Sequence, residues 1–191
     1  MKSKVIDYWE DHLRQEASFL PSLVHLSPAF CSLTVSHPIL WTAGANPHEV
    51  TKAVVQCKMW SGRYQTASLT KHWTPWNRNG WCPSPLCFQT EETLEHLLLW
   101  CPSYSAIRIT LKRLWSTTPS PTVNLFTESL LEAPPSVLLK FILDPSSHPA
   151  VISLGQVLGR DCLHIIHHIA RSWCYSVHRE PSRLRGRFIF E

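Results

Sequence analysis

The sequence predicts a small, irregular, mainly α-helical domain. Three observations favour this fold class: apolar residues recur at helical spacing in several segments, 15 prolines divide the chain into short elements, and glycine is scarce at six residues. Of the 191 residues, 44% are hydrophobic and 17% are charged, which excludes an intrinsically disordered chain. This length is sufficient for one domain with a buried core.

The first predicted helix covers residues 4–20, in which apolar residues follow the helical period and charged residues occupy the other faces. Its apolar face comprises Val5, Tyr8, Trp9, Leu13, Ala17 and Leu20. Prolines then punctuate residues 21–41, so we expect an extended connection there, with at most one short strand.

The second predicted helix begins at Asn46, which can cap it, and has Pro47 at its first position and Glu49 at N3. It should run to Trp60. Gly62, just past this end, can adopt the left-handed conformation that terminates a helix. Its predicted core face comprises Val50, Ala53, Val54, Cys57 and Trp60. A short helix over residues 66–73 and a turn-rich segment over residues 75–85, with a turn at Asn79-Gly80, should follow.

The remaining elements are also predicted to be helical. Thr90 can cap a helix with Glu91 and Glu92 in its first turn, and Ser103 can cap another that stops before Pro119. The apolar side of the latter comprises Ile107, Leu111, Leu114 and Trp115. A helical pattern over residues 149–179 should break or bend near Gly155 or Gly159, and its core stripe comprises Leu163, Ile166, Ala170, Trp173 and Val177.

Three cysteines and one histidine lie within twenty residues, in the pattern C-x4-C-x8-H-x4-C: Cys82, Cys87, His96 and Cys101. Zinc prefers four thiolate or imidazole ligands in a tetrahedron, and a complete set of four leaves no open position for a catalytic water. We therefore predict one structural Zn²⁺ and an embedded CCHC-type zinc knuckle over residues 82–101. The alternative is that these are free buried cysteines and a surface histidine.

The cysteine count is odd at seven, and the N-terminus contains no apolar signal region, so we expect a reducing compartment and no disulfide framework. The predicted location is nuclear or cytoplasmic, not secreted and not in a membrane. His164 and His168 lie one helical turn apart near Cys162 and Cys174, but histidines on a half-buried helix are usually packed or solvated, so we do not predict a second metal site there. No catalytic motif is evident, and we expect no enzyme activity and no small-molecule substrate.

Residues 50–90 contain no acidic residue, whereas lysine, arginine and aromatic residues recur through them. Cations neutralise phosphates and aromatic rings stack on unpaired bases, so this segment and the basic C-terminal tail suit RNA or single-stranded DNA. The predicted nucleic-acid contacts are Lys58, Arg63, Tyr64, Lys71, Trp73, Arg78, Trp81, Phe88, Arg183, Arg185 and Arg187. The alternatives are that the aromatic residues form the core and that the basic tail is solvated.

These patterns divide the chain into four parts. Residues 1–45 hold the N-terminal helix and the proline-rich connection, and residues 46–116 hold helices together with the knuckle. Residues 117–135 are predicted to be a linker, and residues 136–191 a C-terminal helical segment with a basic tail.

Several phrases of the sequence resemble the C-terminal region of the non-LTR (LINE-type) retrotransposon endonuclease-reverse transcriptases of animals. They are HPILWTAGANPHEVTKAVVQCKMWSGRYQT, LTKHW, CPSPLC with LEHLLLWCPSY, and ARSWCYSVHRE with RLRGR. The resemblance runs from about Trp9 to Arg187. It implies a zinc knuckle that helps to grip template RNA or target DNA, with ligands at the four positions given above, and it places the family's S-G-R-Y stretch at Ser61 to Tyr64.

The resemblance does not extend to the family's endonuclease or to its polymerase domain with the catalytic aspartates, so it implies neither nicking nor polymerisation by these residues. The knuckle also has wider gaps than the compact C-x2-C-x4-H-x4-C retroviral form, so sequence-specific readout is not implied. We therefore expect a reverse-transcriptase C-terminal fragment that binds zinc and nucleic acid. The main alternative is a structural zinc module that mediates protein-protein contacts. A third is a chain separated from its polymerase that exposes a packing face. The sequence leaves the oligomeric state open.

Overall fold

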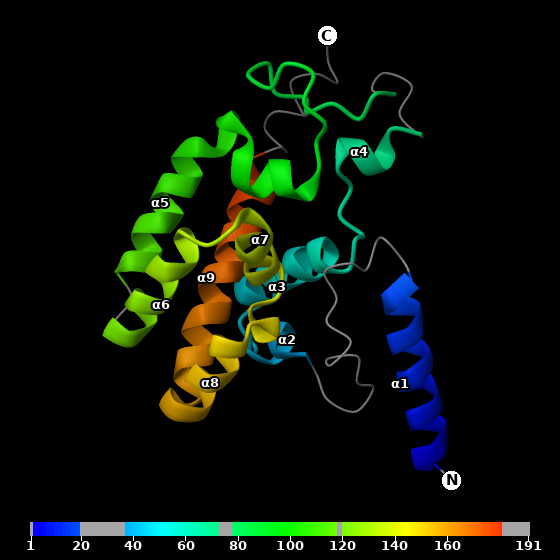
Figure 1. Cartoon of the computed structure of the whole chain (residues 1–191), viewed down its shortest axis with the longest axis vertical. Coiled ribbons are helices and arrows are strands. Elements are labelled where there is room, and N and C mark those ends of the chain that lie inside the picture. The colour runs from blue at the N-terminus through cyan, green and yellow to red at the C-terminus, as the bar shows by residue number, and fades with distance from the viewer. Residues whose placement is uncertain (1, 20–36, 73–77, 118–119, 181–191) are drawn as a thin grey trace.

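The structure is a computed structural model that describes residues 2–19, 37–72, 78–117 and 120–180 (Figure 1). Its regular elements in these ranges are helices, and the one extended pairing is an isolated antiparallel bridge between Trp81 and Glu91. The prediction of a mainly α-helical domain is therefore confirmed. No described helix combines the length and hydropathy required to cross a membrane.

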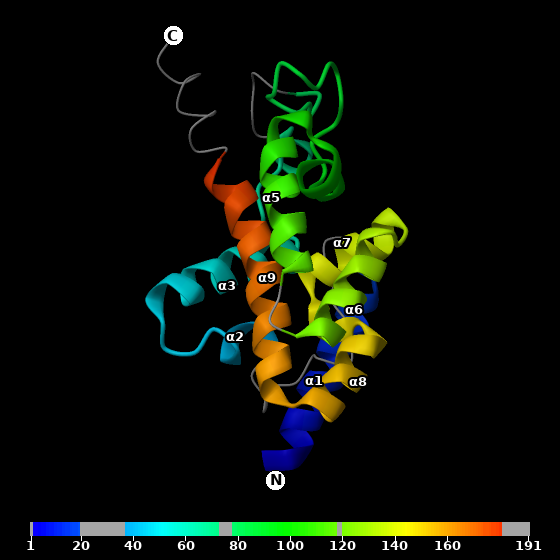
Figure 2. The same ribbon diagram turned by 90° about the vertical axis from the view of Figure 1, so that its left-hand side faces the viewer.

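Helix α9 (Arg160–Arg179) lies at the centre of the bundle, as Figures 1 and 2 show. It contacts α3 (Pro47–Trp60), α5 (Ser105–Ser116), α7 (Pro135–Leu143) and α8 (Pro149–Leu158). Four of the five residues of the predicted stripe are buried on it, namely Ile166, Ala170, Trp173 and Val177, whereas Leu163 is half-buried. The predicted break falls at Gly159, whose φ of 78° ends α8.

Aromatic rings form the middle of the core. The ring centroids of Trp115 and Trp173 are 4.9 Å apart, and those of Trp115 and Phe141 are 5.5 Å apart in an edge-to-face arrangement. All three side chains are at most 1% exposed. The indole Nε1 of Trp173 donates a hydrogen bond to the carbonyl oxygen of Leu98 at 3.3 Å, so α9 also holds the segment that follows His96.

Helix α3 begins as predicted, because the Asn46 side chain accepts hydrogen bonds from the N–H groups of His48 and Glu49. It also ends as predicted, before Gly62, whose φ is 68°. The predicted core face was wrong in part: Val50 and Val54 are exposed, whereas Ala53 is buried and Cys57 and Trp60 pack against its cluster. The buried residues of α3 are Lys52, Ala53, Val55, Gln56 and Met59. This buried face is wide because α3 packs against α2 (Pro38–Trp41), α7 and α9. Its polar members have partners: Gln56 donates to the carbonyl oxygen of Ile142 on α7 at 2.9 Å.

The structure corrects two further predictions. Residues 117–135, predicted to be a linker, contain α6 (Pro121–Leu131), which Ser120 caps and which buries Val123, Thr127 and Leu130. Residues 38–41, predicted to be extended, form α2, which buries Ile39 against α3. In both segments a proline occupies the first helical turn, where its missing N–H costs nothing, so the proline starts the helix instead of breaking it.

Helix α1 (Lys2–Phe19) lies at the edge of the molecule in Figure 1. It confirms the predicted helix, but Val5, Tyr8 and Trp9 of its predicted apolar face are 56%, 65% and 49% exposed. The predicted connection over residues 20–36 lies outside the described residues.

Candidate metal centre and the surface around it

The side chains of Cys82, Cys87, His96 and Cys101 come together, and all four residues are buried. One ligand atom from each of them lies within 4.8 Å of all the others. The sequence prediction that these four residues form one cluster is therefore confirmed. The cluster can hold a metal ion.

A short backbone pairing fixes the position of Cys82. The Cys82 N–H donates to the carbonyl oxygen of Thr90 at 2.7 Å, and the Glu92 N–H donates to that of Gly80 at 2.9 Å. Gly80 has a φ of 68°, and a Cβ atom at this position would lie 2.9 Å from the Cα of Ser68. Glycine is therefore required where the chain enters the metal loop.

Ser84 holds the loop between the first two cysteines. Its carbonyl oxygen accepts from the Cys87 N–H at 3.0 Å, and its hydroxyl accepts from the Leu86 N–H at 3.2 Å. The same hydroxyl forms a hydrogen bond with the hydroxyl of Ser103, two residues after Cys101. The loop that carries Cys82 and Cys87 is thereby tied to the segment that carries Cys101.

A π-helical turn, η3 (His96–Trp100), brings the last two residues of the cluster together. The Cys101 N–H donates to the carbonyl oxygen of His96 at 2.7 Å, a bond between residues five apart. In an α-helix two such residues would be rotated by about 140° from each other, whereas the wider turn returns both to one side. π-turns of this kind are frequent at functional sites.

The predicted helix start at Thr90 was wrong. Helical structure begins at Leu94, where the Thr93 hydroxyl accepts a hydrogen bond from the His96 N–H at 3.1 Å. Residues 90–92 are instead paired with residues 80–82. The buried Glu92 carboxylate accepts a hydrogen bond from the Ala67 N–H at 2.6 Å, so it fixes the segment before the knuckle and does not interact with a helix dipole.

The geometry fits a tetrahedral ion with sulfur ligands. The Sγ atoms of Cys87 and Cys101 are 3.5 Å apart and those of Cys82 and Cys101 are 3.8 Å apart. Zn–S bonds of about 2.3 Å in a tetrahedron require S···S separations of about 3.8 Å. In addition, Nε2 of His96 is buried without a hydrogen-bond partner, and an unsatisfied buried polar atom costs about 1–3 kcal/mol. An ion bound among the sulfurs would supply the missing partner.

The electrostatics of the cluster favour one thiolate held by two thiols before any ion binds. The hydrogen bond from Cys82 lowers the pKa of Cys101 to about 5, and the same hydrogen bond raises the pKa of the Cys82 thiol. Burial raises the pKa of Cys87. Burial lowers the pKa of Arg108, whereas electrostatic attraction to Cys101 and Cys87 raises it. The Arg108 guanidinium therefore lies close to the sulfurs. Metal binding must therefore displace protons from Cys82 and Cys87.

The predicted nucleic-acid contacts are distributed unevenly around this centre. Lys58, Arg63, Arg78, Trp81 and Phe88 are exposed, and the side chain of Phe88 is 85% exposed. Trp73, Arg183, Arg185 and Arg187 lie outside the described residues.

Two predicted contacts are engaged within the protein. Tyr64 is only 8% exposed and its hydroxyl is 3.2 Å from Nδ1 of His178, so its ring belongs to the core and the predicted contact is corrected. Lys71 forms an ion pair with Glu91 at 3.3 Å. Residues 50–90 contain no acidic residue, but the carboxylates of Glu91 and Glu92 lie beside them in the structure.

The predicted contacts did not include two further features of the surface. Helix α5 starts soon after Cys101 and carries Arg108, Lys112 and Arg113, which were not assigned to ligand binding. Trp100 and Leu86 are 54% and 66% exposed. Exposure of an apolar residue beside a metal ligand has no signal in a single sequence.

The histidines of α9 have separate partners, so they form no second metal site in the described part of the chain. Nδ1 of His164 lies 3.1 Å from the carbonyl oxygen of Thr42, and Nδ1 of His168 lies 2.9 Å from a Glu49 carboxylate oxygen. Nε2 of His167 lies 3.0 Å from the hydroxyl of Ser146.

Comparisons with protein-family models, with curated proteins and with solved structures gave no match. The geometry of the site is therefore the basis for the function proposed below.

Proposed function

We propose that this chain binds RNA or single-stranded DNA through a surface organised by one structural zinc ion. We further propose that it corresponds to the C-terminal region of a LINE-type reverse transcriptase, on the sequence resemblance alone. Three thiolates and one imidazole are a ligand set typical of structural zinc, and the four side chains fill the coordination sphere. The proposed role is binding and not catalysis.

Phe88 is the observation that carries the proposal. Its side chain is 85% exposed although it directly follows the buried ligand Cys87, so it contributes little to the core. An aromatic ring fixed by a rigid metal loop loses little entropy when it stacks on a base, and such stacking contributes about 1–3 kcal/mol for each base. Trp81, which precedes Cys82 and is 38% exposed, offers a second ring.

Exposed cations that lie before and after the knuckle in the sequence support the proposal. Arg63 and Arg78 precede it, and Lys112 and Arg113 follow it on α5. Their phosphate contacts would release counterions, so affinity should fall as salt is added.

The test is the affinity of zinc-loaded protein for a short single-stranded RNA, measured by fluorescence anisotropy at several salt concentrations. We expect Phe88→Ala to weaken binding about 5- to 150-fold, the equivalent of about 1–3 kcal/mol. The double variant Arg63→Gln, Arg78→Gln should reduce the slope of log affinity against log salt by about 0.7 for each lost phosphate contact.

Two control variants match these changes. Phe19→Ala removes an 82% exposed ring from α1, and Arg160→Gln removes an exposed cation from the start of α9, at the end of the molecule away from the knuckle in Figure 1. Neither should change affinity or its salt dependence. Binding that does not depend on salt, or that is weakened equally by Phe19→Ala and Phe88→Ala, would contradict the proposal.

A second candidate function is a protein-protein contact at the same surface. Leu86 favours it, because this residue is 66% exposed beside Cys87 and offers no ring on which a base can stack. Under this alternative, the RNA affinity of the wild-type protein would be weak, and Phe88→Ala would not change it.

A further inference from the structure

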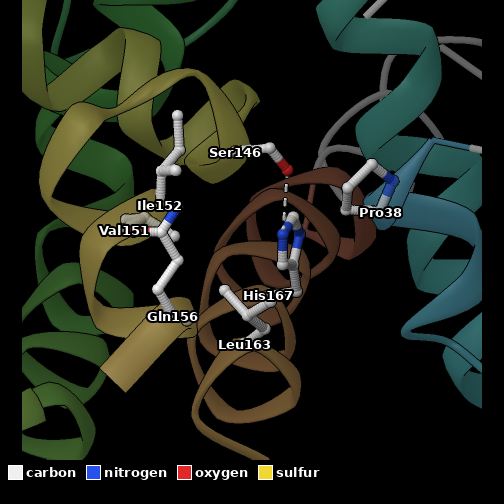
Figure 3. A pocket seen from close by; sticks show the side chains of 8 residues that line it. Pro38, Ser146, Val151, Ile152, Gln156, Leu163 and His167 are labelled. Carbon is white, nitrogen blue, oxygen red and sulfur yellow. Dashed lines mark hydrogen bonds between the residues drawn. The ribbon is translucent and has the colours of Figure 1, made fainter. Parts of the chain in front are cut away.

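A cavity of about 310 Å³ lies between α8, α9, the 3-10 turn Pro145–Ser147 and the first residue of α2 (Figure 3). None of its lining residues belongs to the Cys/His cluster. Four aliphatic residues line it, namely Pro38, Val151, Ile152 and Leu163. Its polar lining residues are Ser146, Gln156 and His167. An apolar protein cavity of roughly 150 Å³ already accommodates benzene, so this one has room for a substituted ring.

Ser146 and His167 form the buried polar end of the cavity, whereas Gln156 is exposed on α8. The two side chains share a hydrogen bond of 3.0 Å between the Ser146 hydroxyl and Nε2 of His167, drawn as the dashed line in Figure 3. The Ser146 backbone is held in turn, because its N–H donates to a carboxylate oxygen of Asp144 at 3.1 Å. The polar end is therefore a fixed part of the lining.

His167 has an unused hydrogen-bonding atom. The residue is fully buried, and its Nδ1 has no hydrogen-bond partner. Burial lowers the pKa of His167 to about 3, so the ring is neutral at physiological pH. A neutral imidazole has one N–H and one bare nitrogen, so Nδ1 donates if the Ser146 hydroxyl donates to Nε2, and accepts if Nε2 donates to the hydroxyl.

The mouth of the cavity is accessible. Ile152 is 48% exposed on α8, whereas Val151 beside it is 1% exposed, so the lining runs from surface to core. A small molecule can therefore reach the interior without unfolding the bundle.

We propose that this cavity binds a small, uncharged molecule with an apolar body and a single hydroxyl or N–H group directed at the Ser146–His167 end. The aliphatic walls disfavour a charged ligand, because a charge among them would lose hydration without a counter-ion. The polar end favours such a ligand over a pure hydrocarbon, because the hydrogen-bonded Ser146–His167 pair can form a further hydrogen bond with it. The proposal is independent of zinc and of nucleic acid.

The test compares two probes of similar size, p-cresol and toluene, by ligand-observed NMR titration of the zinc-loaded full chain. We expect both to bind and p-cresol to bind about fivefold more tightly, the effect of one hydrogen bond of about 1 kcal/mol. His167→Phe should remove the preference, because the ring remains but its nitrogens are lost. Ile152→Trp should block the mouth and weaken both probes at least tenfold, at an exposed position where the substitution is compatible with folding.

Ser153→Ala is the matched control, because Ser153 is exposed on α8 and its hydroxyl bonds only its own helix, to the carbonyl oxygen of Pro149 at 3.2 Å. It should leave both affinities unchanged. If neither probe binds, or if Ile152→Trp leaves binding intact, the cavity is not a binding site. If the two probes bind equally, the role of His167 is overturned. Should His167→Phe fail to fold, the wild-type preference and Ile152→Trp still decide the proposal.

Discussion

Cys101 contributes to the metal cluster through both its side chain and its backbone. Its Sγ lies within 3.8 Å of the other two cysteine sulfurs, and its N–H closes the π-turn on His96. Substitution by serine keeps the backbone bond but replaces a soft thiolate with a poor zinc ligand. We therefore expect Cys101→Ser to lower bound zinc from about one ion per chain to near zero, as measured by elemental analysis.

Loss of the ion should also unfold the knuckle locally, because structural zinc contributes on the order of 10 kcal/mol to units of this kind. Hydrogen exchange should accelerate over residues 80–101 and much less over α9. Cys174→Ser is the control, because Cys174 is fully buried in the main core and lies outside the cluster. It should destabilise the bundle but retain the ion. A full equivalent of zinc in Cys101→Ser would show that the cluster is not the site.

The elements differ in how far their own sequence determines them. The start of α3 could be predicted because its cap, its first proline and its acid are neighbours in the chain. Its buried face could not, because that face depends on α2 and α9, which are remote in sequence. The misplaced start at Thr90 has a similar cause: residues 90–92 pair with residues 80–82, and a backbone partner ten residues away prevailed over a local capping signal.

The candidate site was predictable for the same reason as the start of α3. All four residues of the cluster lie within twenty residues of sequence, and their types alone indicate a candidate metal site. The sequence could not indicate which aromatic residues remain exposed. Tyr64 and Phe88 both lie in the segment that lacks acidic residues, but Tyr64 is buried and Phe88 is exposed. The pairing of Ser146 with His167 had no sequence signal either, because it joins two elements by tertiary packing.

The loop before the knuckle provides a prediction at the scale of an element. Gly80→Ala should destabilise the protein by about 2–4 kcal/mol, because alanine is strained at a φ of 68° and its Cβ would lie 2.9 Å from the backbone of Ser68. Displacement of the loop should also weaken zinc retention in a chelator competition assay. Gly44→Ala is the matched control: its φ of 61° is similar but its Cβ would meet open space, so it should cost only about 1–2 kcal/mol. Equal effects at the two positions would mean that the close approach at Gly80 does not matter.

At the scale of the whole molecule, one carboxylate joins α3 to the central helix α9. Glu49 of α3 accepts hydrogen bonds from Lys52 on its own helix and from Arg171 of α9, and it contacts His168. Nη1 of Arg171 also donates to the hydroxyl of Thr42 at 2.7 Å, just after α2. Although partial burial opposes ionisation, the bonds from Lys52, His168 and Arg171 lower the pKa of Glu49 to about 2.

Acid should destabilise the bundle in two steps, because both Glu49 and His167 bind protons more weakly in the folded state than in the unfolded state. The pKa of His167 falls from about 6.5 unfolded to about 3 folded through burial, so its contribution to stability is lost as the pH falls from 6.5 towards 3. The contribution of Glu49 is present above pH 4.5 and is lost as the pH falls from 4.5 towards 2. Between pH 6.5 and 4.5, protonation of His167 should therefore remove about 2 kcal/mol. Burial also lowers the pKa of His148, so every variant should lose some stability over this range. Urea unfolding should show a loss about 2 kcal/mol larger in the wild-type protein than in His167→Gln, whereas Glu49→Gln should differ from the wild type only below pH 4.5. Release of zinc by acid is common to all three proteins, so it cancels when their free energies of unfolding are compared. If the free energy of unfolding of His167→Gln depends on pH as steeply as that of the wild type, His167 is not the group that titrates.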